Sequence, residues 1–381
     1  MLRKILTFFQ KETVLSISAI LAILSMFIVH PSGKYLSYID FRTLSLLFCL
    51  MSIVAGLSEI GLFDYLAEKI LSRANSIKSI IVLLVLLCFF FSMIITNDVA
   101  LITFVPFAII ILKKMSEKQK NYWILRTVVM QTIAANLGSM LTPIGNPQNL
   151  YLYARANMSA LALIRLMLPY SIAALVLLLV WIQIAAHREP GSTTENHISE
   201  LFSIHKTKAP NQTSLIGYLI LFLICLLVVA HIIDYRISFI LVIGYIFFKN
   251  WHLFKKVDYS LLLTFTALFI FIGNLKCIPQ FNHFLISIID GHETLTAILS
   301  SQIISNVPAA ILLSGFTKNY SALIIGTNIG GLGTLIASMA SLISFKYIAK
   351  EKTTLRGKYF MMFTIANIVF LILLLLCINL L

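Results

Sequence analysis

Charged residues are scarce in this sequence. Only 12% of its 381 residues are Asp, Glu, Lys or Arg, whereas about a quarter are charged in a typical soluble domain. Hydrophobic residues make up 59%, and they form runs as long as a membrane-spanning helix requires, about 17–25 residues. This composition excludes a soluble enzyme and a disordered chain. It predicts an all-α polytopic membrane protein.

Motifs that carry enzyme chemistry are also missing. The sequence has no HExxH, GxSxG or P-loop, so neither peptidase chemistry nor ATP hydrolysis is expected. Its five cysteines lie far apart without a CxxC pair, which predicts neither a disulfide framework nor a zinc site. We therefore expect a protein that is not an enzyme and has no cofactor.

Acidic residues are few beside basic ones, with 15 Asp and Glu against 29 Lys and Arg. The basic residues form short clusters between apolar blocks, so a nucleic-acid partner is not expected. Such clusters mark the cytoplasmic loops of membrane proteins. They predict a multi-pass plasma-membrane protein in contact with the lipid bilayer, with its N-terminus in the cytoplasm and its C-terminus outside.

The apolar blocks predict about nine spanning helices. They lie near residues 13–30, 41–58, 122–153, 160–185, 213–230, 237–248, 257–275, 321–345 and 359–380. The segment 59–78, of mixed charge, predicts an amphipathic helix at the membrane interface.

Two further apolar stretches have polar centres. Stretch 79–112 is too short for two spans and carries Thr96-Asn97-Asp98 in its middle. It predicts a re-entrant hairpin, because non-helical backbone at that depth must be buried in protein or line a wet cavity. Stretch 294–317, centred on Ser305-Asn306, predicts a second hairpin. A single span kinked at Pro308 is the alternative, but it would place the basic segment 346–358 outside.

The sequence also repeats itself internally. Residues 135–146 align without gaps with residues 327–338. Identical pairs in this alignment are Asn136/Asn328, Gly138/Gly330, Thr142/Thr334 and Ile144/Ile336. The order of spans, hairpin and interrupted span repeats as well.

These repeats predict two inverted halves, residues 1–185 and 237–381, joined by residues 186–236. The first half holds hairpin 79–112 and broken helix 122–153, and the second holds hairpin 294–317 and broken helix 321–345. Interrupted helices at matching positions of two inverted halves are typical of secondary transporters with a binding site at mid-membrane.

At these motifs the sequence resembles the ion-transporter superfamily. This group contains the sodium/divalent-anion symporters, the citrate-transporter-like permeases and the arsenite efflux permeases. The resemblance covers nearly the whole chain and is most specific at the two tips, at residues 142–149 and at residues 328–331. It implies alternating access by an elevator-like or rocking movement, and a homodimer.

The resemblance also implies two sodium-type sites, with ligands from Ser92, Thr96 and Asn97 and from Ser301, Ser305 and Asn306. The symporters carry a threonine after each tip asparagine. This chain has Asp98 and Val307 there, a pattern closer to the arsenite-permease and citrate-transporter-like branches.

Polar residues at the tips and in the breaks are the candidate binding residues. They are Ser92, Thr96, Asn97, Asp98, Asn136, Gly138, Thr142, Asn146, Ser301, Ser305, Asn306, Asn328, Gly330 and Thr334. An intramembrane carboxylate such as Asp98 is a functional candidate, and a helix N-cap is its structural alternative. The asparagines have turn closure as their alternative, and the glycines have close helix packing.

The predicted function is secondary active transport, coupled to Na⁺ or H⁺, of a small anion or oxyacid such as a carboxylate. Within the superfamily, the alternatives are an arsenite/antimonite efflux permease and a cation/proton antiporter. A membrane-embedded enzyme and a channel are alternatives of a different class.

Overall fold

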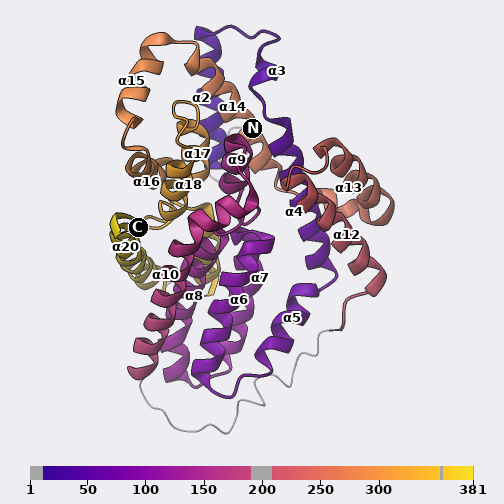
Figure 1. Cartoon of the computed structure of the whole chain (residues 1–381). Coiled ribbons are helices and arrows are strands. Elements are labelled where there is room, and N and C mark those ends of the chain that lie inside the picture. Colours follow the sequence, from indigo (N-terminus) through magenta and orange to yellow (C-terminus); the bar gives the residue numbers. More distant parts are fainter. Residues whose placement is uncertain (1–11, 190–207, 352–354, 381) are drawn as a thin grey trace, which may run out of the picture.

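The structure, a computed structural model, describes residues 12–189, 208–351 and 355–380. This part of the chain is helical and has no strand (Figure 1). Residues 190–207 of the predicted joining segment 186–236, and residues 352–354 of the predicted basic segment 346–358, lie outside the described residues. The prediction of an all-α fold is confirmed.

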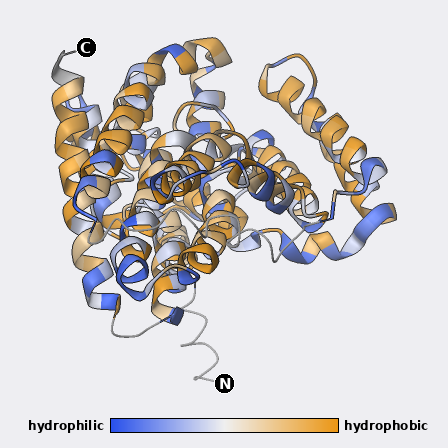
Figure 2. Cartoon of the chain, turned by 90° about the horizontal axis from the view of Figure 1, so that it is seen from below, coloured by the Kyte–Doolittle hydropathy of each residue, from blue (hydrophilic) through white to orange (hydrophobic). Residues whose placement is uncertain are grey.

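Seven described segments are long and apolar enough to cross a membrane. They lie in α4 (Phe41–Glu59), α6 (Ile77–Ile95), α10 (Ala160–His187), α12 (Gln212–Val229), α13 (Tyr235–Asn250) continued by η1 (Trp251–Lys256), α14 (Tyr259–Lys276) and α20 (Arg356–Leu380). Large apolar side chains are exposed along them, and hydrophobic residues dominate the outer helices in Figure 2. Because water would disfavour such a surface, the protein is a polytopic membrane protein.

The remaining predicted spans are short or interrupted. α2 (Thr13–Ile28) is a shorter apolar helix. Predicted span 122–153 consists of α8 (Glu117–Ser139) and α9 (Pro147–Ala156), and predicted span 321–345 consists of α18 (Tyr320–Ile329) and α19 (Met339–Glu351). Both interruptions fall in the glycine-containing segments identified from the sequence.

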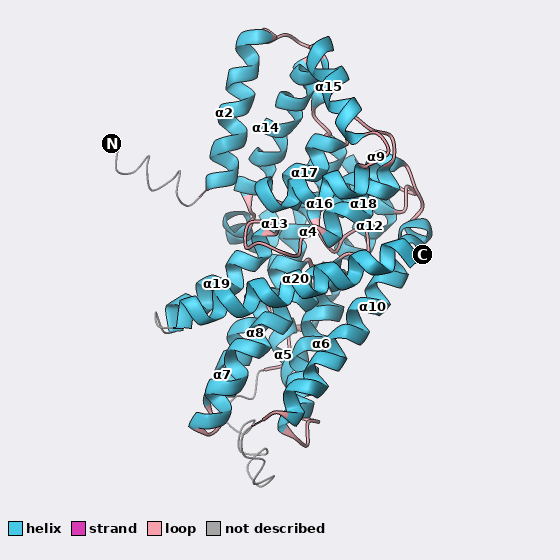
Figure 3. Cartoon of the chain, turned by 90° about the vertical axis from the view of Figure 1, so that its left-hand side faces the viewer, coloured by secondary structure: helices cyan, strands magenta, loops and turns pink. Residues whose placement is uncertain are grey.

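Each predicted hairpin stretch forms two helices that contact one another. The first pair is α6 and α7 (Asn97–Lys113), and the second is α16 (Glu293–Ile304) and α17 (Asn306–Leu313). Figures 1 and 3 show the first pair in the lower half of the molecule and the second pair in the upper half. α6 has 19 residues and is by itself long enough to span a membrane, so the re-entrant path of this pair stays a prediction.

Three short helices complete the described fold: α3 (Tyr35–Tyr38), α5 (Leu62–Leu71) and α15 (Pro279–Ile289). α5 buries Phe63, Ala67 and Leu71, which are spaced four residues apart on one face. The amphipathic pattern predicted for segment 59–78 is therefore present in the structure.

Helices of the two halves pack in matching combinations. α2 contacts α14, and α13 contacts α4; α9 contacts α17, and α19 contacts α7. In the predicted repeat α2 corresponds to α13, α4 to α14, α7 to α17 and α9 to α19. Exchanging the halves therefore converts each contact into the other. This reciprocity is expected of two halves related by an approximate two-fold axis.

Candidate functional site

Both tips have the same unusual backbone conformation. Thr96, between α6 and α7, has φ 77° and ψ 152°, and Ser305, between α16 and α17, has φ 75° and ψ 153°. Residues with a Cβ rarely adopt this region, and each such residue costs of order 1–3 kcal/mol. The next residue, Asn97 or Asn306, begins a helix. Two equivalent positions thus hold strained hydroxyl residues where glycine would fit more easily.

Each tip is hydrogen-bonded to the break in the neighbouring helix. The backbone N–H of Asn97 donates to the carbonyl of Gly145 at 3.1 Å, and that of Asn306 donates to the carbonyl of Ala337 at 2.9 Å. Gly145 and Ala337 are paired in the ungapped sequence alignment. The tips therefore lie level with the breaks, at matching places in the two halves.

The two break threonines make a second matching contact. The Thr142 hydroxyl donates to the carbonyl of Met93 in α6. The Thr334 hydroxyl donates to the carbonyl of Gln302 in α16 at 3.1 Å. Met93 and Gln302 both stand three residues before their tip residue. These threonines bind the first arm of a hairpin, and Thr334 is exposed.

Asn136 in α8 joins the first tip to the second broken helix. Its Oδ1 accepts from Asn97 Nδ2 at 3.1 Å and from Ser338 Oγ at 3.0 Å, and its Nδ2 donates to Ser341 Oγ at 3.3 Å. All four side chains are buried. Two of the candidate binding residues, Asn97 and Asn136, are thus in direct contact.

Asn328 in α18 makes the equivalent two bonds to the first half, again accepting through Oδ1 and donating through Nδ2. Its Oδ1 accepts from Asn146 Nδ2 at 2.9 Å, and its Nδ2 donates to Asn149 Oδ1. Asn146 and Asn149 occupy the positions that Ser338 and Ser341 hold in the other half. Each broken helix therefore satisfies the asparagine of the other.

Sequence reasoning missed Asn149 and Ser341 as members of this network. Continuing the ungapped alignment by three residues would have paired them. The signal is that both side chains are polar and stand one helical turn after Asn146 and Ser338.

The serine and the glycine at equivalent positions of the two halves have a packing explanation. Ser92 Oγ donates to the carbonyl of Phe89 at 2.9 Å, and Ser301 Oγ donates to that of Ala297 at 2.7 Å. A Cβ at Gly138 would lie 2.0 Å from the Phe89 oxygen, and a Cβ at Gly330 would lie 2.9 Å from Ser301 Oγ. Both glycines thus allow a helix to approach a hairpin arm closely, which favours the packing alternative for them.

Asp98 is the second residue of α7 and does not cap it. The cap position is Thr96, whose side chain makes no capping hydrogen bond. The backbone N–H of Asp98 donates to Asn97 Oδ1 at 3.0 Å. Its carboxylate has no hydrogen-bond or ion-pair partner among the residues the structure describes, and it faces a cavity. This environment favours a functional carboxylate over a helix cap.

The cavity beside Asp98 has a volume of about 260 Å³. It is bounded by α4, the start of α7, the start of α9 and the start of α14. Its polar lining residues are Ser58, Thr96, Asp98, Thr103, Asn146, Lys256 and Asp258. Asp258 caps α14 by accepting the Leu261 N–H at 3.0 Å. Lys256 and Asp258 were missed from the sequence, because they stand at the boundary of the predicted span 257–275, where charged residues usually mark the end of a span.

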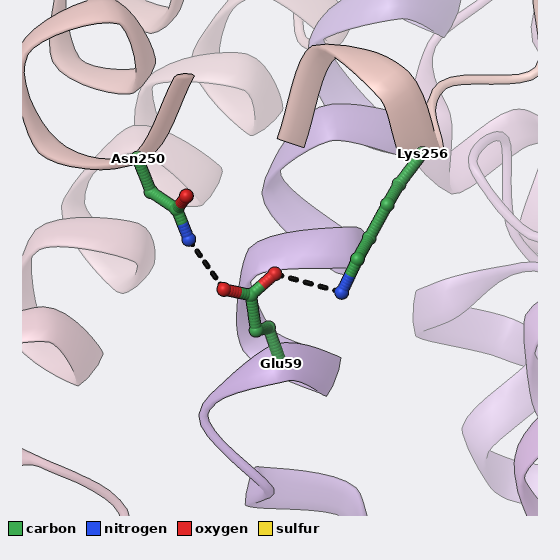
Figure 4. A network of polar contacts seen from close by, with 3 residues as sticks. All are labelled: Glu59, Asn250 and Lys256. Carbon is green, nitrogen blue, oxygen red and sulfur yellow. Dashed lines mark hydrogen bonds and ion pairs between the residues drawn. The ribbon is translucent and has the colours of Figure 1, made fainter. Parts of the chain in front are cut away.

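A small polar network joins the end of α4 to the ends of α13 and η1. Lys256 Nζ lies 2.7 Å from one carboxylate oxygen of Glu59, and Asn250 Nδ2 donates to the other (Figure 4). Since Lys256 also lines the Asp98 cavity, Glu59 balances its charge there.

The tips differ in their access to this cavity. Thr96, Asp98 and Asn146 line it, whereas the second-tip residues Ser305 and Asn306 do not. Within the described residues, no group of three or more His, Cys, Asp or Glu side chains could hold a metal ion. The two sodium-type sites remain predictions.

Comparison with known proteins places this chain in a transporter family. Residues 5–319 match the family described as citrate transporter. The chain is similar to an uncharacterized transporter of Methanocaldococcus jannaschii, with 34% identity over 332 residues that cover 87% of each protein. It is 32% identical over 332 residues to the inner membrane protein YbiR of Escherichia coli, covering 85% of this chain and 84% of that protein.

A more distant relative extends this similarity. An uncharacterized transporter of Mycobacterium tuberculosis is 22% identical over 355 residues, covering 84% of this chain and 79% of that protein.

Proposed function

The chain belongs to the citrate transporter family, and on that premise we propose that it couples transport of a small anion or oxyacid to Na⁺ or H⁺. The observation that carries the proposal is the cavity that leads to Asp98, Thr96 and Asn146, where a tip and a helix break meet. Unwound backbone beside a cavity is the usual setting of transporter binding sites.

Helix N-termini near the breaks support an anionic substrate. α17 begins at the second tip, and α9 begins at the first break. The N-terminus of a helix favours anions, because its free N–H groups and its dipole point outward. The first turn of α17 contains no acidic residue, so nothing there opposes an anion.

The first tip is suited to the coupling ion instead. Asp98 brings a negative charge to the start of α7, and Asp258 lines the same cavity. An unpaired carboxylate at this depth either binds a proton or helps to hold a cation. The two tips would thus divide the work, with the coupling ion at the first and the anion nearer the second.

The reciprocal contacts support movement of the hairpins and broken helices as one unit. Asn136 and Asn328 join the two broken helices, and each tip is bonded to a break. We include in the proposal an inverted repeat of residues 1–185 and 237–381, alternating access and a homodimer. The N-terminus would be cytoplasmic and the C-terminus external.

Counterflow in proteoliposomes tests the function. Labelled citrate, succinate, sulfate and arsenite are supplied at two pH values, with and without sodium. We expect at least one anion to exchange and its net uptake to depend on a gradient of Na⁺ or H⁺. Flux without counterflow would indicate a channel. Chemical conversion of the substrate would indicate an enzyme. Exchange of arsenite alone would support the efflux alternative.

Two substitutions test the tips. Asn97→Ala and Asn306→Ala should each reduce transport by about 10-fold or more, since each removes hydrogen bonds worth about 1.5–3 kcal/mol to a charged ligand. Asn121→Ala, at an exposed position of α8 away from the break, is the matched control. Wild-type transport by either tip variant would refute the two-tip site.

A further inference from the structure

A second cavity, of about 250 Å³, lies at the other ends of the helices that border the Asp98 cavity. Its walls come from the start of α4, the last turns of α9 and α14, and α17. The lining residues are Ser37, Tyr38, Asp40, Tyr151, Arg155, Phe269, Ile272, Gly273, Lys276, Cys277, Ile311 and Gly315.

Two basic side chains line this cavity. Arg155 is in the last turn of α9, and Lys276 is the last residue of α14. In the part of the chain that the structure describes, neither has a hydrogen-bond or ion-pair partner. The one acidic lining residue, Asp40, uses both oxygens to cap α4, accepting the backbone N–H of Thr43 at 3.0 Å and its hydroxyl at 2.8 Å.

Tyr151 and two phenylalanines pack where α9 passes from one cavity to the other. Leu150 lines the Asp98 cavity, and the next residue, Tyr151, lines the second one. The Tyr151 hydroxyl lies 2.8 Å from Ser314 Oγ, and its ring packs against Phe265 and Phe269. Asp98 and Asp258 thus line one cavity, Arg155 and Lys276 line the other, and the Tyr151 ring packs against two phenylalanines beside the second cavity.

We propose that the cavity lined by Arg155 and Lys276 is a second anion site, where a small carboxylate or oxyanion binds on the side opposite to the Asp98 cavity. This inference rests on the proposed function and assigns the substrate an entry or exit position. An anion between the two cations would remove their mutual repulsion and form charge-assisted hydrogen bonds. The Tyr38 hydroxyl, bonded only weakly to Cys277 Sγ at 3.6 Å, supplies a further donor.

The native cysteine in this cavity provides a readout that does not depend on transport. Cys277 is exposed, whereas Cys49, Cys88 and Cys225 are buried. A protein that keeps Cys277 as its single thiol is treated with a thiol reagent in the presence of citrate, succinate or sulfate, at ionic strength held constant with potassium chloride. We expect at least one of these anions to slow the modification in a saturable manner.

Matched variants assign the protection to the two cations. Arg155→Gln and Lys276→Gln should each raise the half-protecting concentration by about 10-fold or more, as expected for loss of a charge-assisted contact. Arg165→Gln removes one positive charge from an exposed position of α10 that does not line the cavity, and it should leave protection unchanged. An equal effect of all three variants would overturn the proposal.

Two further results separate this site from the transport site and from lipid binding. Protection should persist in the Asn97→Ala/Asn306→Ala protein, because that protein keeps the cavity even where transport is lost. If the double variant lost protection, the second site would not be separate from the transport site. Absence of counterflow by the wild-type protein would instead refute the proposed function and leave the protection result standing. Protection by phosphatidylglycerol vesicles but by none of the three anions would make the two cations lipid anchors and would also overturn the proposal.

Discussion

Asp98 lies at a helix junction, and its carboxylate faces a cavity. Within the described structure, no basic side chain hydrogen-bonds to this carboxylate. A cation bound there would favour the charged form, so protons and the cation would compete. We expect Asp98→Asn to weaken coupling and to flatten the pH dependence of transport. Initial rates between pH 6 and pH 8, with and without sodium, measure both effects.

The sign of the pH effect follows from this competition. In the wild-type protein, apparent cation affinity should fall as the pH falls, because protonation removes the charge that attracts the cation. Asp290→Asn, at the exposed end of α15, removes an acid outside the cavity and serves as the control. An Asp98→Asn protein with an unchanged pH profile and an unchanged sodium response would eliminate the coupling role.

The strained tip residues lead to a stability prediction. Thr96→Gly should be more stable than Thr96→Ala by about 1 kcal/mol, and Ser305→Gly should exceed Ser305→Ala likewise. Glycine relieves about 1–3 kcal/mol of backbone strain at positive φ but loses about 0.5–1 kcal/mol to its greater unfolded-state entropy. Both replacements lack the hydroxyl, so the comparison isolates the backbone. Thermal unfolding in detergent measures the order, and a more stable alanine variant at either tip would contradict it.

At the residue scale, the sequence was sufficient to predict features that depend on a few consecutive residues. The position of Thr96-Asn97-Asp98 in an apolar stretch was sufficient to predict a helix junction there, and the structure has one. Bonds between distant segments, such as Asn328 with Asn149, depend on how separate helices pack, and a single sequence does not encode that packing in any short pattern.

At the scale of elements, the breaks and hairpin arms form paired units. α9 and α19 each begin two residues after the break carbonyl, of Gly145 or Ala337, that accepts a tip N–H. Hydropathy located these elements because apolar runs and glycine-rich interruptions are visible along the chain. It did not predict that Lys256 and Asp258 would line the cavity, because they stand at the edge of the predicted span 257–275 and nothing in the hydropathy pattern shows which helices pack beside that edge.

The ion pair between Glu59 in α4 and Lys256 in η1 predicts opposite changes of cation affinity when one or the other residue is replaced. Glu59→Gln leaves Lys256 unbalanced at the Asp98 cavity, so the coupling cation should bind a few-fold more weakly. Lys256→Gln removes the positive charge and should strengthen cation binding. Neither change should alter stability by more than about 1 kcal/mol, because an exposed ion pair contributes about 0–1 kcal/mol.

Titration of transport with sodium, or with protons at fixed sodium, measures the two affinities. Lys113→Gln disrupts another interhelical ion pair, Lys113 with Glu351, whose residues do not line the cavity. It should therefore behave like wild type. Shifts of the same sign for Glu59→Gln and Lys256→Gln would show that the charge at this position does not act on the cation site.

For the whole molecule, the predicted orientation can be tested at three exposed positions. Ser116→Cys and Lys350→Cys should react only with a membrane-permeant thiol reagent, and Asn319→Cys should react with an impermeant one, in a protein lacking the native cysteines. The reason is the clustering of basic residues near 113–126 and 346–358. Labelling of Ser116→Cys or Lys350→Cys by the impermeant reagent would contradict the inverted arrangement.

The exchanged asparagine bonds have a consequence for biosynthesis. Asn136 and Asn328 are each satisfied by side chains from the opposite half. When the first half enters the membrane, Ser338 and Ser341 have not yet been made, so the Asn136 Nδ2 group lacks its partner in an environment where an unpaired polar group is costly. The interior of the first half is therefore completed only when the second half arrives. Assembly of this transporter resembles the docking of two subunits that happen to share one polypeptide.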